Sequence, residues 1–448
     1  MDADHLASLR RADAAHHLHP FTDHAEMHRQ GTHIIREASG CHVVDETGRR
    51  LLDGLAGLWC VNVGHGRREI ADAVHQQMLA VAYYPSFFNS TTEPAIRLAE
   101  RLAGLAPAGM RRVFFANSGS EANETALKLI RAYHKLRGRP ERRTILTRTF
   151  SYHGVGVATA SMTGLPSCNL PFDLPLPGFV HVPGPHPYGV DSELSAEAYA
   201  EQCLAETARV IEREGPGTIA ALFAEPVQGA GGVIAPPPGH LKALRELCRA
   251  HEILFVADEV ITGFGRLGAW FASTLWDLQP DLITTAKGIT SGYVPLGATL
   301  LADPVADTLV DGGYLAHGFT YSGHPVAAAA ALANFDIRER ERLIERVRDD
   351  IGPYFQGKLR ALAGHPAVGE VRGYQLIGAL DLLPRGGRAA LRSPPVLGGV
   401  AAGLCREEGV IVRGIRDLIA MSPPLTISRA EVDQLFAAVA AALDRLWA

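Results

Sequence analysis

Lys287 lies in the stretch TTAKGITSGYVPLG, residues 284–297, among small residues. It closes an apolar run at residues 282–286. Burial disfavours the charged form of a lysine and lowers its pKa, so such an amine can act as a nucleophile or as a base. Taken alone, a lysine in this position is more often a surface or ion-paired residue. The residues that share its site must therefore decide its role.

Four earlier apolar runs, each ending in polar residues, cover residues 112–116, 144–147, 219–224 and 253–257. Because ligands bind beyond the carboxyl ends of strands in open α/β sheets, we expect these run ends to lie together. The first run leads into Ser118, Gly119 and Ser120. Ser118 can cap a helix with Glu121, which leaves the N–H groups of Gly119 and Ser120 free for a phosphate. An ordinary capped helix explains this motif equally well.

The other run ends supply aromatic and acidic side chains. Tyr152 and His153 follow the second run, Glu225 follows the third, and Asp258 and Val260 follow the fourth. A single charged residue at a strand end is usually a solvated rim residue. Two acids, an aromatic pair, an anion site and a lysine at five successive run ends instead indicate one shared ligand.

Pyridoxal phosphate (PLP) is the ligand that suits this set, because it has an aldehyde, a phosphate, a flat ring and a ring nitrogen that works best protonated. Lys287 would form a Schiff base with the aldehyde. Asp258 would pair with the protonated ring nitrogen. Tyr152 and Val260 would cover the two ring faces, and residues 119–120 would hold the phosphate.

The helices and strands that must position these residues are predicted to form an α/β fold. Apolar runs of this length are typical of strands covered on both faces by helices, which predicts a mostly parallel sheet. Residues 61–325 are expected to form a large cofactor-binding domain. Residues 1–60 and 326–448 are expected to combine into a smaller α+β domain. Within the latter, residues 327–351 predict one long helix, and a capping box of Ser428 and Glu431 predicts the start of the last helix.

Composition restricts the class of protein. The formal net charge of the 448 residues is −5 and no basic block occurs, so neither nucleic acid nor membrane is an expected partner. The six cysteines are scattered without a CxxC pair, and the N-terminus has no apolar signal region, which predicts a cytoplasmic protein. Histidines between residues 16 and 28 are irregularly spaced, and their pattern matches no ligand set. A solvated arm is the expectation there, and no metal site is predicted.

Long stretches of the chain resemble class III aminotransferases, and among them the ω-amino acid and amine:pyruvate transaminases. The matching stretches are FANSGSEANETALKLIRAYH, SYHG, AEPVQGAGGVIAPP, ADEVITGFGRLG, TTAKGITSGYVPLGA, HGFTYSGHPVAAAAAL and VRGIRDLIAMSPPL. They span most of the chain in the family's order. The resemblance implies fold type I of the PLP enzymes, with a central, mostly parallel sheet of seven strands.

The resemblance also implies roles for individual residues. Lys287, Asp258 and Tyr152 match catalytic positions. Cofactor-binding positions are Ser118, Gly119, Ser120, Tyr152, His153, Glu225, Asp258, Val260, Lys287, Phe319 and Thr320. Thr320 would reach the phosphate from a neighbouring subunit, so a homodimer with shared active sites is expected, and a tetramer is left open. Glu225 would order a water molecule or the surroundings of Asp258.

On the substrate side, the resemblance implies a pocket for an amine donor and a keto acid acceptor in turn. The matching positions are Trp59, Phe87, Tyr152, Ala230 and Arg413, with Phe21 reaching in from the N-terminal arm. Arg413 would pair with a substrate carboxylate and swing out for uncharged groups. Trp59 and Phe87 fit equally well as core aromatics. Arg416 departs from the family, which has a small residue there, and is interpreted as a solvated loop charge rather than a residue that alters carboxylate preference.

The function implied is transfer of an amino group from a primary amine or ω-amino acid to a keto acid, with pyruvate expected. The reaction would be ping-pong through pyridoxamine phosphate (PMP), with Lys287 moving the proton. The alternatives are a diamine, ornithine or other class III enzyme that uses 2-oxoglutarate, and a PLP-dependent decarboxylase or aminomutase. A dinucleotide oxidoreductase would need GxGxxG directly between a strand and a helix, and a metal hydrolase would need HExxH. GFGRLG at residues 263–268 has the first spacing but does not directly follow an apolar run and belongs to a stretch that resembles the aminotransferases, and HExxH does not occur.

Overall fold

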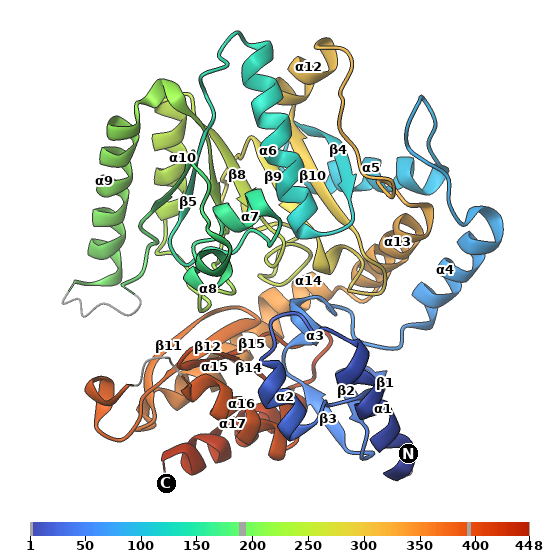
Figure 1. Cartoon of the computed structure of the whole chain (residues 1–448), viewed down its shortest axis with the longest axis vertical. Helices are drawn as coiled ribbons and strands as arrows, with labels where there is room; N and C mark the ends of the chain where they lie inside the picture. The colour runs from blue at the N-terminus through green and yellow to red at the C-terminus, as the bar shows by residue number, and fades with distance from the viewer. Residues whose placement is uncertain (1–2, 188–193, 392–395, 448) are drawn as a thin grey trace.

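A seven-stranded sheet forms the centre of the larger part of the molecule in this computed structural model, which describes residues 3–187, 194–391 and 396–447 (Figure 1). Its strands, in spatial order, are β4 (Met110–Ala116), β10 (Gly297–Ala302), β9 (Leu282–Thr285), β8 (Leu254–Asp258), β7 (Ile219–Ala224), β5 (Thr144–Arg148) and β6 (Phe179–Val182). β10 is antiparallel to both of its neighbours, and the remaining pairs are parallel. The predicted mostly parallel sheet is confirmed. All five apolar runs are strands, whereas β6 and β10 were not predicted.

Helices cover both faces of this sheet, and so its strands are apolar throughout. Every residue of β7 is buried. Along β7, Ala221 and Phe223 pack on one side against α6 (Gly119–Leu136) and α12 (Asp303–Asp311). Leu222 and Ala224 face the other side, which α5 (Glu93–Leu105), α9 (Ala196–Glu214), α10 (His240–Ala250) and α13 (Pro325–Arg340) cover. Because side chains alternate between the two faces of a strand, each strand contacts helices on both faces of the sheet.

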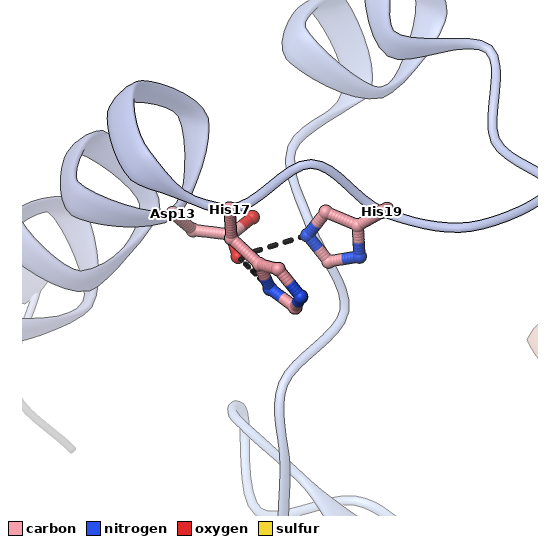
Figure 2. Close-up of side chains that lie close together, drawn as sticks. All are labelled: Asp13, His17 and His19. Carbon is pink, nitrogen blue, oxygen red and sulfur yellow. Dashed lines mark hydrogen bonds and ion pairs between the residues drawn. The ribbon is translucent and has the colours of Figure 1, made fainter.

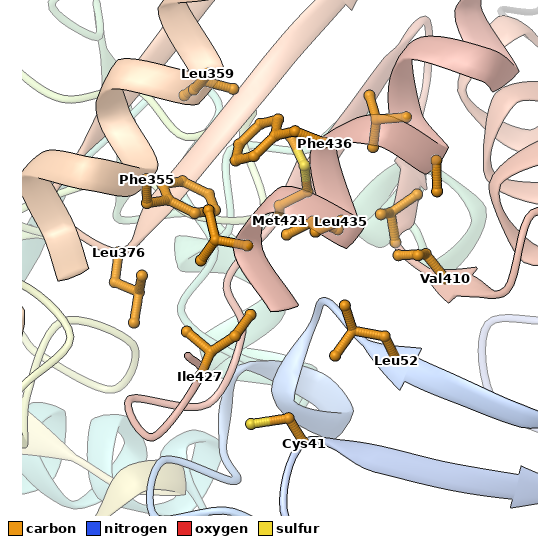
Figure 3. Close-up of a cluster of buried hydrophobic side chains, with 14 of the residues drawn as sticks. Cys41, Leu52, Phe355, Leu359, Leu376, Val410, Met421, Ile427, Leu435 and Phe436 are labelled. Carbon is orange, nitrogen blue, oxygen red and sulfur yellow. The ribbon is translucent and has the colours of Figure 1, made fainter. Parts of the chain in front are cut away.

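The smaller part of the molecule joins the two ends of the chain. One sheet contains β1 (Ile35–Ser39), β2 (His42–Asp45), β3 (Arg50–Asp53) and β13 (Val410–Ile411), and a second contains β11 (Val368–Tyr374), β12 (Ile377–Leu382), β15 (Leu418–Met421) and β14 (Arg413–Ile415). In Figure 3, Cys41 and Leu52 pack in the same buried cluster as Phe355, Met421 and Leu435. An α+β unit built from both termini is therefore confirmed. Its boundaries at residues 60 and 325 remain a prediction.

The single long helix predicted over residues 327–351 is wrong. α13 ends at Arg340, and Arg342 has a left-handed backbone with φ of 49° before the chain resumes as α14 (Leu343–Arg346). A π-helical segment, η4 (Val347–Ile351), leads into α15 (Gly352–Ala361). Tertiary contacts explain the break, because Arg67 binds the carboxylate of Glu341 through two hydrogen bonds of 2.8 Å.

The last helix, α17 (Arg429–Trp447), begins as predicted. The Ser428 hydroxyl accepts from the Glu431 N–H at 3.2 Å, and the Glu431 carboxylate accepts from the Ser428 N–H at 2.7 Å. The remaining helices are α1 (Ala3–His16), α2 (His24–Gln30), α3 (Ala56–Trp59), α4 (Arg68–Val81), α7 (Val157–Met162), α8 (Pro166–Asn169), α11 (Ala272–Leu275) and α16 (Leu397–Glu407). Within the described ranges, no helix has the length and apolar character needed to cross a bilayer.

Candidate active site

A cavity of about 660 Å³ opens where the parallel strands of the large sheet end, at the junction with the smaller part of the molecule. Its volume is in the range of small-molecule sites. Most of the residues predicted for the site line it: Trp59, Gly119, Ser120, Tyr152, His153, Glu225, Ala230, Asp258, Val260, Lys287 and Arg413. The fold therefore gathers at one place the ends of five strands that are distant in the sequence.

Lys287 lies two residues beyond the end of β9 and presents its amine to this cavity. Its backbone is left-handed, with φ of 46°, a conformation that costs energy for a residue with a Cβ and that recurs at functional sites. Loss of hydration lowers the pKa of the amine, and the nearby Asp258 carboxylate opposes this shift only in part. A lysine with a lowered pKa has a larger neutral, nucleophilic fraction near neutral pH.

Asp258 is held rigidly at the end of β8 and is only 3% exposed. Its Oδ2 accepts hydrogen bonds from Asn123 Nδ2 and His153 Nδ1, both at 2.7 Å. Its Oδ1 accepts from the Val260 N–H at 3.1 Å. These three contacts engage both oxygens and fix the orientation of the carboxylate. The structure thus presents a carboxyl group in one fixed position at the cavity wall.

The role of Asn123 was not found from the sequence. It lies one turn into α6, is buried, and links three elements. Nδ2 donates to Asp258 and to the His153 carbonyl at 2.8 Å, while Oδ1 accepts from the Thr284 hydroxyl at 2.8 Å. The only signal was a polar residue on the alanine-rich, core-facing side of the helix. Such a residue needs buried partners, but the sequence does not say which.

Glu225 supports the backbone around the site through its carboxylate. Its two carboxylate oxygens accept from the N–H groups of Tyr152 at 2.9 Å and Gly229 at 3.1 Å. Full burial raises the pKa of Glu225 to about 7. The carboxyl group therefore fixes Tyr152 and the glycine-rich loop at 229–232 relative to each other.

The start of α6 has the predicted cap. The Ser118 hydroxyl accepts from the Glu121 N–H at 3.1 Å, which makes Gly119 the first helical residue. The Glu121 carboxylate bonds to the N–H of Asn117 at 2.7 Å, one residue earlier than in a capping box. Ser118 itself is not in the cavity wall, whereas Gly119 and Ser120 are. Their N–H groups are at the positive end of an 18-residue helix, which suits an anion.

Aromatic and aliphatic side chains form the walls of the cavity. Tyr152 and Val260 both line it, as predicted for the two faces of a flat ring. Trp59 is 1% exposed and packs in a buried cluster, yet it also borders the cavity, so both interpretations of this residue hold. Phe21, from the N-terminal arm, lies at the cavity as predicted and is 75% exposed, which puts it at the mouth.

Arg413 enters the cavity from β14, in the smaller part of the molecule. It is partly buried, and loss of hydration lowers the pKa of its guanidinium. Among the described residues, no carboxylate forms a salt bridge with it; the Tyr152 phenol and the Cys168 thiol oppose this shift. A partly desolvated guanidinium without an internal acid is suited to an external carboxylate.

Arg416 is not the solvated loop charge that was expected. Its guanidinium lies over the Phe150 ring at 5.0 Å and donates to the carbonyl of Gly231. Arg372 donates to the next carbonyl, that of Gly232, at 3.0 Å. Arg416 therefore helps to fix the glycine-rich loop that carries Ala230 into the cavity wall.

Three predicted site residues lie away from this cavity within the chain. Phe87 packs against Gly318 and lines a separate surface cavity of about 870 Å³. Phe319 and Thr320 follow Gly318, and the Thr320 carbonyl accepts from the Tyr83 hydroxyl at 2.7 Å. Within one chain, Phe87 therefore lies apart from the cavity that it was predicted to line.

The donor set and the shape of the cavity fit PLP. Gly154 has φ of 133°, and a Cβ there would meet the Ser120 hydroxyl at 2.6 Å, so the phosphate end requires glycine. A Cβ at Gly119 would meet both γ carbons of Val260 at 3.0 Å. An anion site, the Val260 side chain, the Asp258 carboxylate and the Lys287 amine thus suit the phosphate, one ring face, the ring nitrogen and the aldehyde in turn.

Comparison with known proteins agrees with this site. The class III aminotransferase family model matches residues 24–443. The putrescine–pyruvate aminotransferase of Pseudomonas aeruginosa is 41% identical over 96% of this chain and 94% of its own length. The diaminobutyrate–2-oxoglutarate transaminase of Halomonas elongata is 38% identical over 92% of this chain and 90% of its own.

Solved structures show the same fold type I architecture. The ω-transaminase of Pseudomonas jessenii in complex with PMP superimposes with a TM-score of 0.94, at 40% identity, over 98% of each chain. The family match covers more than nine-tenths of the sequence and includes every strand of the large sheet. The chain therefore belongs to the class III aminotransferases and is a PLP-dependent enzyme of that family.

Proposed function

We propose that the protein is an amine or ω-amino acid transaminase that uses pyruvate as acceptor. The observation that carries the proposal is the sharing of one cavity by Lys287, Asp258 and Arg413, which would serve the reacting amine, the cofactor ring nitrogen and a substrate carboxylate, respectively. The apolar wall of Trp59 and Leu55 beside them suits a donor whose amine-bearing carbon also carries hydrogen or an apolar group.

The bound cofactor would supply the electron sink, and the protein supplies everything else. The Lys287 amine would take the proton from the carbon atom that bears the amino group of the donor. The same amine would later give up this proton to complete the transfer. Asp258 would pair with the ring nitrogen of the cofactor and favour its protonated form. Tyr152, whose N–H donates to Glu225, would cover one face of the ring.

Arg413 would distinguish the two substrates. It offers a guanidinium to the carboxylate of a keto acid and has no acid partner of its own among the described residues. β14 is only three residues long and lies at the end of its sheet, so the side chain can move when an uncharged donor occupies the same space.

A substrate panel tests the proposed function. β-Alanine, taurine, putrescine and an aryl-alkylamine are each mixed with the holoenzyme, and the colour change of the cofactor reports the first half-reaction. Pyruvate is expected to reverse the change faster than 2-oxoglutarate. Faster reversal by 2-oxoglutarate would favour the diamine-type alternative, and release of carbon dioxide or an isomerised amine without any keto acid would favour a decarboxylase or aminomutase.

Replacing Arg413 with alanine is expected to raise the KM for pyruvate by about 10–150-fold, because hydrogen bonds to charged groups contribute about 1.5–3 kcal/mol. The first half-reaction with a donor that lacks a carboxylate should keep its rate. Arg445→Ala, which removes an exposed ion pair on α17, is the matched control. Equal losses for carboxylate and non-carboxylate substrates would contradict this role for Arg413.

We further propose a homodimer in which Phe87 and Thr320 complete the active site of the partner. Exposed apolar side chains gather around the separate cavity beside Phe87, including Phe88 (89% exposed), Tyr314 (90%) and Ile96 (56%). A patch of this kind usually marks a protein interface. The patch contains the loop of Thr320, so one contact surface would explain why these residues lie outside their own chain's cavity.

Phe88→Asp is expected to break the dimer and the activity together. Wild-type protein should sediment at twice the chain mass of 48.0 kDa, and the variant at the chain mass. Val400→Asp on α16, at a residue 50% exposed outside this patch, should remain dimeric and active. A wild-type monomer with full activity would refute the shared site.

The division into domains at residues 60 and 325 and the cytoplasmic location are proposed with this function. Strand pairing between β3 and β13 supports a small domain made from both ends of the chain. All six cysteines are free, which is the usual state in a reducing compartment.

A further inference from the structure

The N-terminal arm contains a group of metal-binding side chains that the transaminase site does not use. Asp13, in the last turn of α1, lies close to His17 and His19, as Figure 2 shows. Asp13 Oδ1 is 3.3 Å from His17 Nδ1 and 2.9 Å from His19 Nε2. The sequence predicted a solvated arm here rather than a metal site, but a spacing of four residues brings Asp13 and His17 to the same side of the chain.

From this geometry we propose that Asp13, His17 and His19 bind a zinc ion. A tetrahedral ion with bonds of about 2.0–2.1 Å holds its ligand atoms about 3.3 Å apart. The two separations from Asp13 are close to that value, and all three ligand atoms lie within 4.8 Å of one another. Two imidazoles and one carboxylate form a donor set typical of zinc, with water in the fourth position.

Outer contacts hold the ligands in place. The second oxygen of Asp13 accepts a hydrogen bond of 2.5 Å from the Thr32 hydroxyl, which leaves Oδ1 directed at the histidines. The backbone N–H of His19 donates to His24 Nε2 at 3.0 Å, which holds the chain in place at this ligand. The bond from Thr32 is of the kind that orients carboxylate ligands at known metal sites.

The exposure of the three side chains and their protonation are both compatible with zinc binding. The side chain of His17 is 62% exposed, while those of Asp13 and His19 are 18% and 21% exposed, so an ion can enter from solvent and still be partly enclosed. Each imidazole would ligate in its neutral form, with its remaining proton on the other ring nitrogen. The ion replaces the two hydrogen bonds to Asp13 Oδ1 and needs no further reactant.

The position of the cluster gives the ion a consequence for the enzyme. Pro20 and Phe21 directly follow His19 and line the mouth of the Lys287 cavity. Phe21 has a left-handed backbone with φ of 51°, a strained conformation that neighbouring contacts must maintain. A zinc ion on residues 13, 17 and 19 would fix the arm and hold these two residues over the cavity. The metal is thus a structural clamp on the substrate entrance and takes no part in the chemistry.

Isothermal titration of the untagged, chelator-treated holoenzyme with zinc chloride tests the proposal without measuring turnover. One zinc per chain is expected, with magnesium chloride giving no binding. The double variant His17→Gln, His19→Gln should lose this site, and Thr32→Val should weaken it by about 10–100-fold. His16→Gln, at the end of the same helix, is the matched control and should bind like wild type.

The cofactor absorbance and circular dichroism of each variant establish that it has folded. Zinc binding by the double variant equal to that of wild type would overturn the proposal, as would equal binding of magnesium, or loss of the site in His16→Gln. Absence of zinc binding in the wild-type holoenzyme would also overturn it. None of these outcomes depends on which amine or keto acid the enzyme uses.

Discussion

Replacing Lys287 with alanine is expected to abolish transamination while the protein stays folded. The substitution removes both the nucleophile that engages the cofactor and the base that moves the proton. Proton transfer by a positioned side chain alone contributes about 10²–10⁴-fold, and loss of the attacking amine adds to it, so kcat should fall by at least about 10⁴-fold. Steady-state assays with the best donor and acceptor of the substrate panel measure this loss.

Two additions separate chemistry from folding in this variant. Lys242→Ala removes an exposed lysine that pairs with Asp277 on the surface, and it should retain wild-type turnover. A small primary amine added to the Lys287→Ala enzyme should restore part of the first half-reaction, because it supplies the missing base. A Lys287→Ala enzyme with near wild-type kcat would contradict the role of this residue.

Asp258→Asn is expected to be the second most damaging change. Asparagine has nearly the same shape and keeps some hydrogen bonds with Asn123 and His153, but it cannot balance a positive charge on the ring nitrogen. Removal of one partner of a buried charge pair costs about 3–5 kcal/mol, which corresponds to about 10²–10⁴-fold in kcat. Pre-steady-state measurement of the first half-reaction shows whether the loss lies in the proton-transfer step.

A control variant distinguishes charge from packing at this position. Asp281→Asn alters another carboxylate at the sheet, which pairs with Arg245 and accepts from the Phe255 N–H, away from the cavity. It should affect thermal stability more than kcat. An Asp258→Asn enzyme whose kcat falls less than about tenfold would mean that the carboxylate does not control the ring nitrogen.

The sequence was informative wherever a site residue directly follows a buried strand. Lys287, Asp258 and Glu225 each come within two residues of a strand end, so the sheet topology alone brings them together. The cap at Ser118 was also predictable, because it depends on residues three apart in the chain. Each of these predictions depends on a short local pattern and on the rule that ligands of α/β folds bind beyond the carboxyl ends of the strands.

Other features depend on contacts that no local pattern contains. Asn123 and Thr284 join Asp258 through side chains from three elements, and the break at Arg342 follows from ion pairing of the neighbouring Glu341 with Arg67. The separate location of Phe87 reflects the path of a surface loop. The grouping of Asp13 with His17 and His19 needed the turn after α1 as well as the helical spacing.

Chemical trapping tests the central claim most directly. The holoenzyme is reduced with borohydride, digested, and its peptides are analysed by mass spectrometry. The account predicts one phosphopyridoxyl group per chain, on the side-chain nitrogen of Lys287. Attachment to a different lysine, or no attachment in a preparation that carries out transamination, would contradict it.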